Sequence, residues 1–218
     1  MQNSRPVMTA CEIRQLSETF EIGAHTLNHV VLTEVSVETA ENQIRGSKKQ
    51  LEELTGRSCD SFCFPKGRFR RCHLDMVRGA GFRCARTVEL LSTRFPVRRA
   101  DIYMIPTTLQ TTPHTRTVYL KNCAKRLALG NLGNFFLYAQ SRNWTETARS
   151  MLQAVAQHGG VFHLWGHSWE IEEQQQWPQL ESILRHMGEL RATLPCVPNS
   201  KLIRLEAAPY AASVPVAR

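Results

Sequence analysis

Apolar residues recur with a period of about 3.6 residues, the spacing of an α-helix, in several parts of the chain. The clearest repeat covers residues 36–54, where one face carries Val37, Ala40, Ile44, Leu51 and Leu54. Gly56 follows and is the kind of residue that ends a helix. Similar spacing predicts further helices near residues 9–20, 71–79, 115–129, 143–157 and 176–194. The first of these begins with a capping box, formed by Thr9 and Glu12.

Short runs of apolar and β-branched residues lie between the predicted helices. They predict strands at residues 20–24, 61–64, 82–88, 101–106, 161–165 and 201–205. Gly130 and Gly133 predict a loop after the helix at residues 115–129. Strands that alternate with helices indicate an α/β fold with a mainly parallel sheet. No linker or repeat divides the chain, so we expect one domain over residues 1–206 and a disordered or loosely packed tail over residues 207–218.

Composition excludes several classes of protein. The chain has 218 residues, 42% of them hydrophobic and 21% charged, as in ordinary globular proteins. A net charge of +8 suggests an anionic neighbour, but the Lys and Arg residues are scattered and no nucleic-acid motif is present, so no nucleic-acid partner is expected. No run of about 18 apolar residues indicates a membrane span. Residues 1–6 contain no apolar segment of a secretory signal, so we expect a cytoplasmic protein whose seven cysteines are reduced.

Histidines follow two of the predicted strands. His25 and His29 are four residues apart, so a helix that started at Ala24 would place them on one face. Two imidazoles arranged in this way can hold a zinc ion, although two histidines can also share a helix face by chance. In the strand at residues 161–165, period-two alternation puts His163, Trp165 and His167 on one face, with His167 at the strand's carboxyl end.

These motifs resemble those of the polysaccharide deacetylase family, which has the NodB-homology fold and is also called carbohydrate esterase family 4. The run Phe20–His29 resembles the histidine motif, which reads H-[ST]-x-x-x-H or a close variant, and Phe64–Gly67 resembles the motif R-x-P-x-G. Val161–Glu170 resembles the late strand that delivers the catalytic histidine. The resemblance extends over about residues 10–205. It implies a distorted (β/α) barrel with its site at the carboxyl ends of the strands.

The resemblance also implies a chemistry: metal-dependent hydrolysis of N-acetyl groups on an amino-sugar polysaccharide or glycolipid. His25, His29 and an aspartate would hold a divalent metal, expected to be zinc. The backbone amide of Lys66 would stabilise the oxyanion, and His167 would protonate the leaving amine. The expected substrate-binding residues are those of the proline–glycine turn and two tryptophans: Pro65, Gly67, Trp165 and Trp169. A turn that only connects two elements and a core role for either tryptophan are the alternatives.

The chain departs from the family pattern at several positions. The motif T-F-D-D, which carries the catalytic base and the third metal ligand, is not found upstream of His25; the carboxylates there are Glu12, Glu18 and Glu21. Cys63 occupies the position of the arginine in R-x-P-x-G. The Asp-Trp element of the family's fourth motif is not recognisable, and Arg83 or Arg86 could be its remnant. Glu170, three residues after His167, could provide a carboxylate or simply cap or pair at the surface.

Two hypotheses therefore remain open. In the first, the chain is a deacetylase whose aspartates were lost by truncation or a misassigned start, with impaired activity; coding sequence upstream of Met1 would then contain T-F-D-D. In the second, it is a non-catalytic relative that binds a glycan or a protein. A barrel that is incomplete at its amino terminus would expose a sheet edge, which favours a homo-oligomer.

Overall fold

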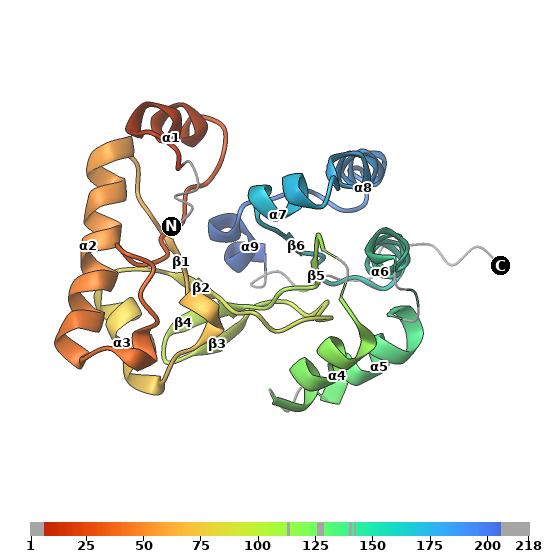
Figure 1. Cartoon of the computed structure of the whole chain (residues 1–218), viewed down its shortest axis with the longest axis horizontal. Coiled ribbons are helices and arrows are strands. Elements are labelled where there is room, and N and C mark those ends of the chain that lie inside the picture. The colour runs from red at the N-terminus through yellow and green to blue at the C-terminus, as the bar shows by residue number, and fades with distance from the viewer. Residues whose placement is uncertain (1–6, 113, 126–128, 140, 142, 206–218) are drawn as a thin grey trace. The chain divides into compact units, whose positions relative to one another are not determined.

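The chain divides into two compact units, each built from separate segments of the sequence. The computed structural model describes residues 7–112, 114–125, 129–139, 141 and 143–205. Of these, the first unit takes the residues up to Thr87, Val97–Ile105 and Pro198–Ile203, and the second takes the remainder (Figure 1). A single domain over residues 1–206 stays a prediction, and the tail predicted at residues 207–218 lies outside the described residues.

The first unit contains a four-stranded sheet. In sheet order its strands are β1 (Ser61–Cys63), β2 (Cys84–Arg86), β4 (Ile102–Ile105) and β3 (Val97–Arg99). β1, β2 and β4 are parallel, and β3 runs antiparallel to β4. Beyond β1, the strand predicted at residues 20–24 is reduced to one parallel bridge between Ala24 and Phe62. The predicted α/β class with a mainly parallel sheet is confirmed.

Helices α1 (Ala10–Ser17), α2 (Val37–Thr55) and α3 (Arg71–Gly79) follow the sequence prediction closely. Thr9 and Glu12 form the predicted capping box of α1. Ser36 caps the start of α2, and Gly56 ends it in the left-handed conformation, with φ of 66°. Figure 1 shows α2 and α3 beside the sheet. The apolar core that they share with it includes Ala24, Ile44, Phe62, Phe64, Val77 and Ile102.

The opposite face of the sheet is polar. Strand register places Ser61 beside Cys84 and Cys63 beside Arg86, so these four side chains share the face turned away from the apolar core. The segment predicted as a strand at residues 201–205 is instead a helix, α9 (Asn199–Leu205). A helix forms because Lys201 and Leu202 both donate backbone hydrogen bonds to the carbonyl of Pro198.

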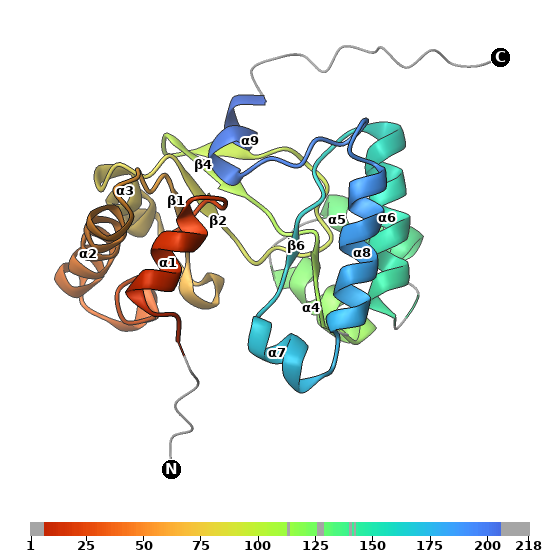
Figure 2. The same ribbon diagram turned by 90° about the horizontal axis from the view of Figure 1, so that it is seen from above.

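The second unit consists mainly of helices. They are α4 (Arg116–Lys125), α5 (Leu129–Tyr138), α6 (Trp144–His158), α7 (Ser168–Glu173) and α8 (Trp177–Glu189). Its two short parallel strands are β5 (Leu109–Gln110) and β6 (Leu164–Trp165), so the strand predicted at residues 161–165 is shorter than expected. Figure 2 shows α6 and α8 side by side. The core of this unit includes Leu91, Leu109, Phe135, Met151 and Ile183.

The loop predicted at Gly130 and Gly133 is wrong, because both glycines lie in helix α5. Each glycine costs a helix about 1 kcal/mol relative to alanine. Tertiary contacts offset this cost: Phe135 is buried, and the amides of Asn131 and Asn134 donate to the carbonyls of Leu90 and Leu91. The predicted preceding helix ends at Lys125, and residues 126–128 lie outside the described part of the chain.

No helix within the described residues is both long enough and apolar enough to cross a membrane.

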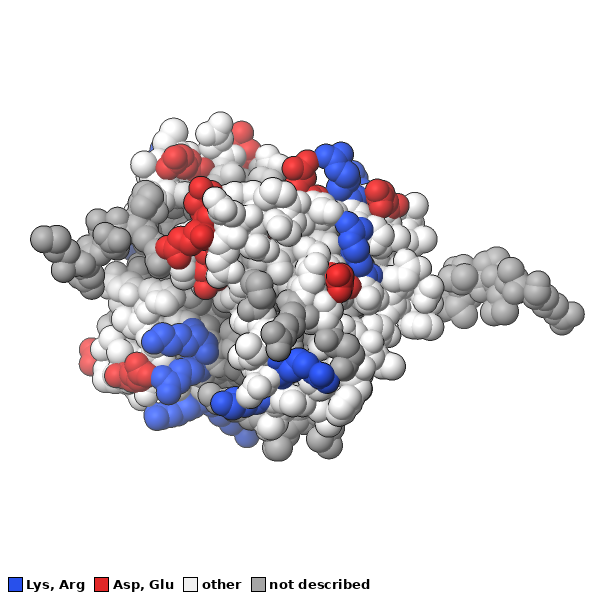
Figure 3. Space-filling model, turned by 45° about the vertical axis from the view of Figure 1, so that its right-hand side comes forward, with Lys and Arg blue, Asp and Glu red and all other residues white. Residues whose placement is uncertain are grey.

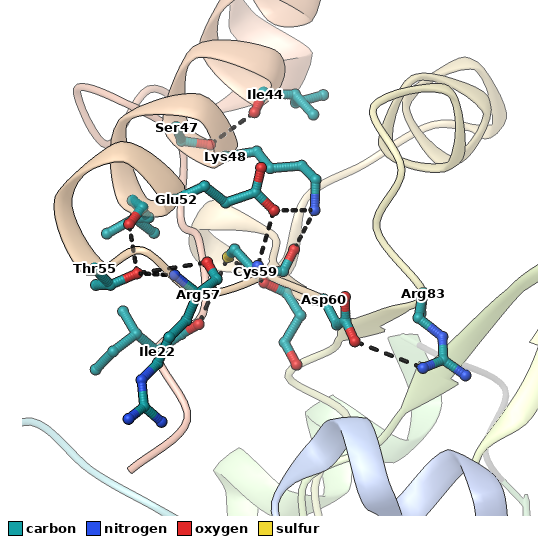
Figure 4. Close-up of polar contacts among 12 residues, drawn as sticks. Ile22, Ile44, Ser47, Lys48, Glu52, Thr55, Arg57, Cys59, Asp60 and Arg83 are labelled. Atoms are coloured by element: carbon teal, nitrogen blue, oxygen red, sulfur yellow. Dashed lines mark hydrogen bonds and ion pairs between the residues drawn. The ribbon is translucent and has the colours of Figure 1, made fainter. Parts of the chain in front are cut away.

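A polar network joins the end of α2 to the start of β1 (Figure 4). Glu52 lies 3.0 Å from the ammonium of Lys48, and its carboxylate accepts a hydrogen bond of 3.0 Å from the backbone N–H of Cys59. Lys48 also donates to the Cys59 carbonyl. The Lys48–Glu52 ion pair therefore binds both the backbone N–H and the backbone carbonyl of Cys59, which is almost fully buried.

We expect this network to make the first unit sensitive to acid. The Cys59 N–H, and after it Lys48, lower the pKa of Glu52 below its usual 4.5. A depressed folded-state pKa gives stability that is present above the unfolded pKa and lost as the pH falls through the folded pKa. Glu52→Gln should therefore lower the free energy of unfolding at pH 7 by about 0.5–1 kcal/mol, a figure already reduced for solvent screening. The difference should disappear near pH 3.

Urea unfolding of the wild type and Glu52→Gln at both pH values measures this difference. The matched control is Glu53→Gln, because Glu53 is exposed and contacts only Lys49 among the ion pairs described, at 3.8 Å. An equal difference between wild type and Glu52→Gln at both pH values would contradict the prediction.

Candidate functional site

His25 and His29 lie in a turn that follows the bridge at Ala24. A helix from Ala24 onward, the condition under which the two rings would share a helix face, does not form, because residues 25–29 are not helical. Thr26 and His29 instead have left-handed backbones, with φ of 63° and 54°. The two imidazole rings nevertheless meet, with centroids 4.8 Å apart and planes at 68°. The turn therefore brings together the two side chains that a helix was expected to align.

The backbone fixes the tautomer of His25. Its Nδ1 lies 2.7 Å from the carbonyl oxygen of Cys63, on the neighbouring strand β1. A carbonyl can only accept, so Nδ1 carries the hydrogen and Nε2 carries the lone pair. A ring N–H held by a backbone carbonyl is usual for histidines that bind metals through their other nitrogen.

The two imidazoles at this turn provide part of a binding site for a divalent metal. His25 and His29 provide two imidazoles, which suit zinc and related ions. Within the described ranges, no group of three or more His, Cys, Asp and Glu side chains is arranged to hold a metal ion. Zinc sites usually have at least three protein ligands, so a further ligand would have to join this pair.

The turn at Pro65, Lys66 and Gly67 follows β1. It therefore lies at the same end of the parallel strands as the histidine pair, which follows the bridge at Ala24. Lys66 has a left-handed backbone, with φ of 54°. Such a conformation costs a residue with a side chain about 1–2 kcal/mol. The surrounding structure holds it: Pro65 and Gly67 are buried, and the Gly67 N–H donates to the Phe64 carbonyl over 2.8 Å. Strained backbone at the carboxyl ends of parallel strands is common at ligand sites.

His167 belongs to the second unit, where it precedes helix α7. Its ring lies between two tryptophans: the Trp165 ring is 4.8 Å away, edge to face, and the Trp169 ring is stacked at 5.0 Å. Nδ1 of His167 is 2.9 Å from a carboxylate oxygen of Glu170. The side chain of His167 remains 42% exposed, so a ligand can reach it.

The candidate residues fall in separate units. His25, His29 and the turn at residues 65–67 belong to the first, and Trp165, His167 and Trp169 belong to the second. Within each unit the structure brings its own candidates together.

Comparison with known proteins finds a family model that matches the amino-terminal part of the chain. The family model for polysaccharide deacetylases matches residues 6–85, which contain the histidine pair and the turn at residues 65–67. In this region the chain is similar to the polysaccharide deacetylase family. No curated protein matches the chain.

Solved structures show the fold. A candidate polysaccharide deacetylase from Mycobacterium smegmatis has 15% identity and a TM-score of 0.57, over 94% of this chain and 71% of its own. The 4-alpha-glucanotransferase from Thermococcus litoralis has 12% identity and a TM-score of 0.55, over 89% of this chain and 30% of its own. The likeness to the deacetylase confirms the predicted fold, a distorted (β/α) barrel of the deacetylase type.

Other solved deacetylases match a smaller part. The polysaccharide deacetylase from Bacillus cereus has 18% identity and a TM-score of 0.40, over 49% of this chain. The chain spans 33% of that protein and 47% of a Streptococcus pyogenes deacetylase.

The carboxylates upstream of His25 are occupied in structural roles or exposed. Glu12 accepts hydrogen bonds from Thr9 in the capping box of α1. Glu18 is exposed. The carboxylate of Glu21 accepts from the Ser61 hydroxyl and, over 2.9 Å, from the Ser200 N–H. Glu21 therefore ties the segment before the histidine pair to β1 and α9.

Arg86 lies beside the cysteine that replaces the arginine of this deacetylase motif. Cys63 and Arg86 are partners in the register of β1 and β2, and Arg86 is only 8% exposed. Burial lowers the pKa of Arg86 to about 10 and raises that of the Cys63 thiol. Arg86 Nη1 is 3.4 Å from the amide oxygen of Asn199. Arg83, the alternative to Arg86 as a remnant of the fourth motif, is paired with Asp60 (Figure 4), and the choice between the two stays open.

Proposed function

We propose that the chain hydrolyses N-acetyl groups on the amino sugars of a polysaccharide or glycolipid, using a divalent metal held by His25 and His29. The contact between these two imidazoles carries the proposal, together with the Cys63 carbonyl that leaves the His25 lone pair on Nε2. When bound, the metal would act as a Lewis acid toward the acetyl carbonyl. Zinc is the expected ion, because imidazole suits it.

The turn after β1 would stabilise charge on the acetyl oxygen. We assign this role to the backbone N–H of Lys66, with Pro65 and Gly67 shaping the turn. A donor of this kind is effective when it is held in place before the reaction, since no energy is then needed to orient it. The buried flanking residues and the hydrogen bond from Gly67 to Phe64 provide such rigidity.

His167, in its doubly protonated form, would protonate the amine as the carbon–nitrogen bond breaks. Its Nδ1–H is directed to Glu170, so the proton would be given up from Nε2, leaving the neutral Nδ1–H ring. Trp165 and Trp169 flank the ring and would provide apolar surface for the acetyl methyl group or a sugar ring.

The charge of the surface suits an acidic glycan. On the face shown in Figure 3, several Lys and Arg side chains gather in the lower part, with some Asp and Glu side chains beside them at the left. The chain as a whole has a net charge of +8. Such a surface attracts anionic polymers.

A second candidate function is binding without catalysis, to a glycan or a protein. Two observations favour it: the described residues complete no three-ligand metal site, and Cys63 replaces a cationic motif residue. General base catalysis contributes about a hundredfold or more to a rate, so a chain without the aspartate base would be a slow enzyme at best.

Metal content measured by mass spectrometry, together with acetate release from N-acetylglucosamine oligomers, tests the proposal. We expect about one zinc ion per chain in the wild type and none in His25→Ala/His29→Ala, with acetate release reduced at least about a hundredfold by loss of the metal. The control is His158→Ala/His186→Ala, which removes two histidines from helices α6 and α8 and should change neither readout. Metal bound equally by both double variants, or by neither them nor the wild type, would contradict the metal site. Metal binding without acetate release would favour the binding function.

A further inference from the structure

Four side chains of the second unit form a continuous hydrogen-bonded chain that ends at His167. Nδ1 of His167 lies 2.9 Å from Oε2 of Glu170. The same oxygen is 3.3 Å from Nε2 of Gln110, on strand β5. The other end of that amide, Oε1, is 2.7 Å from Nε2 of His114. Residues more than 50 positions apart in sequence are thereby connected to the proposed catalytic histidine.

The direction of every bond in this chain follows from its acceptor. An ionised carboxylate only accepts, so His167 donates through Nδ1–H and Gln110 donates through its NH₂ group. The carbonyl end of the Gln110 amide then faces His114, which must donate through Nε2–H. Both donor paths therefore converge on Glu170, and both histidines have a defined tautomer when neutral.

The outer part of the chain is shielded from water. Gln110 is 9% exposed, and the ring of His114 packs edge to face against Tyr119, with centroids 5.6 Å apart. Burial lowers the pKa of His114, and the charge of Glu170 opposes this change more weakly. The Glu170 carboxylate, which only accepts, sets the orientation of the Gln110 amide, and the Nε2–H of His114 stabilises that orientation by donating to the amide oxygen.

We propose that Gln110 and His114 are positioning residues that act through Glu170 to keep Nδ1–H of His167 on the carboxylate, so that Nε2 is the atom that gains the transferred proton and gives it up, and the neutral ring is the Nδ1–H tautomer. Glu170 alone, three residues from His167, could rotate away. Gln110 ties it to β5, and His114 prevents the amide from flipping its oxygen toward the carboxylate. The tautomer is a property of the folded chain, whereas its effect on rate rests on the function proposed above.

A simpler role for Glu170 must be separated from this one. Glu170 lies in the first turn of α7, where a carboxylate stabilises a helix by interaction with its dipole. Such a role would be insensitive to the tautomer of His167 and to substitutions at Gln110 or His114. Helix α8 contains a matched pair: His186 Nδ1 lies 3.0 Å from Glu189, also three residues apart, but Glu189 is 67% exposed.

The tautomers can be observed directly by proton–nitrogen correlation NMR of the imidazole-labelled chain, at a pH where the rings are neutral. We expect His167 in the Nδ1–H form and His114 in the Nε2–H form. Glu170→Leu should return His167 toward the Nε2–H form, and Glu170→Gln, which keeps an acceptor, should do so less. Glu189→Leu should leave His167 unchanged. An unchanged His167 spectrum in Glu170→Leu would overturn the proposal.

Substitutions at His114 distinguish the proposed positioning role from a purely structural role of Glu170. His114→Leu removes the donor to Gln110, whereas His114→Gln keeps an N–H donor. We expect His114→Leu, and not His114→Gln, to change the His167 spectrum. His114→Leu should also lower the kcat of deacetylation by about threefold to tenfold, with KM little altered. The corresponding loss of kcat for Glu170→Leu should be about 10–100-fold. Equal effects of Leu and Gln on the spectrum would refute the role of His114. If the chain releases no acetate, the spectra still decide the proposal, and only the assigned reaction fails.

Discussion

Replacing Phe62 by alanine is expected to lower the free energy of unfolding by about 3–5 kcal/mol, the cost of truncating a buried aromatic side chain. Phe62 is 1% exposed and occupies the centre of the first unit's core. Its ring is 5.2 Å from those of Phe64 and Phe82, and its backbone bridges to Ala24. The cavity left by the substitution would therefore lie directly behind the turn that carries His25 and His29.

Urea unfolding followed by circular dichroism measures the effect. Phe20→Ala is the matched control, because Phe20 belongs to the same unit but is 62% exposed, and its loss should change stability by no more than about 0.5 kcal/mol. A similar loss of stability in both variants would show that burial in this core does not account for the contribution of Phe62.

The second large effect is expected in the other unit, for Gly160→Ala. Gly160 has a φ of 124°, and an added Cβ would lie 2.4 Å from the carbonyl oxygen of Thr93. That oxygen also accepts a hydrogen bond of 2.7 Å from the Val161 N–H, so neither backbone segment can move without weakening the contact. Steric overlap and backbone strain together should destabilise the chain by about 2–4 kcal/mol.

Gly188→Ala is the matched control for this substitution. Gly188 lies near the end of helix α8, and an added Cβ would meet no other atom within 4 Å. Helix propensity then predicts a stabilisation of up to about 1 kcal/mol, opposite in sign to the effect at Gly160. Thermal and urea unfolding of both variants should show this opposite pair of changes. A Gly160→Ala chain as stable as the wild type would be inconsistent with the backbone contact to Thr93.

Much of the candidate site could be found from local sequence. His25, His29 and the proline–glycine turn were recognisable because their motif lies within a few residues, and the same holds for His167 and Glu170. Gln110 and His114 could not be found in this way. Gln110 has no motif of its own, and its connection to Glu170 arises because β5 pairs with β6 across more than 50 residues of sequence.

The sequence by itself determined the α/β class and the helices whose signals are local. The apolar repeat, the Ser36 cap and Gly56 together specified α2, and Asn143 with its following repeat specified α6. These features depend on residues within about one helical turn of each other, so no distant contact was needed to predict them.

Only the tertiary structure decided the contacts that give the site its chemistry. The histidine pair meets through a left-handed turn rather than a helix, and the tautomer of His25 is set by a carbonyl on β1. Helix α5 forms through its glycines because distant carbonyls accept from its asparagines. For the His25 tautomer and for helix α5, the deciding interaction joins residues far apart in sequence, and its free energy exists only when strands pair and helices pack.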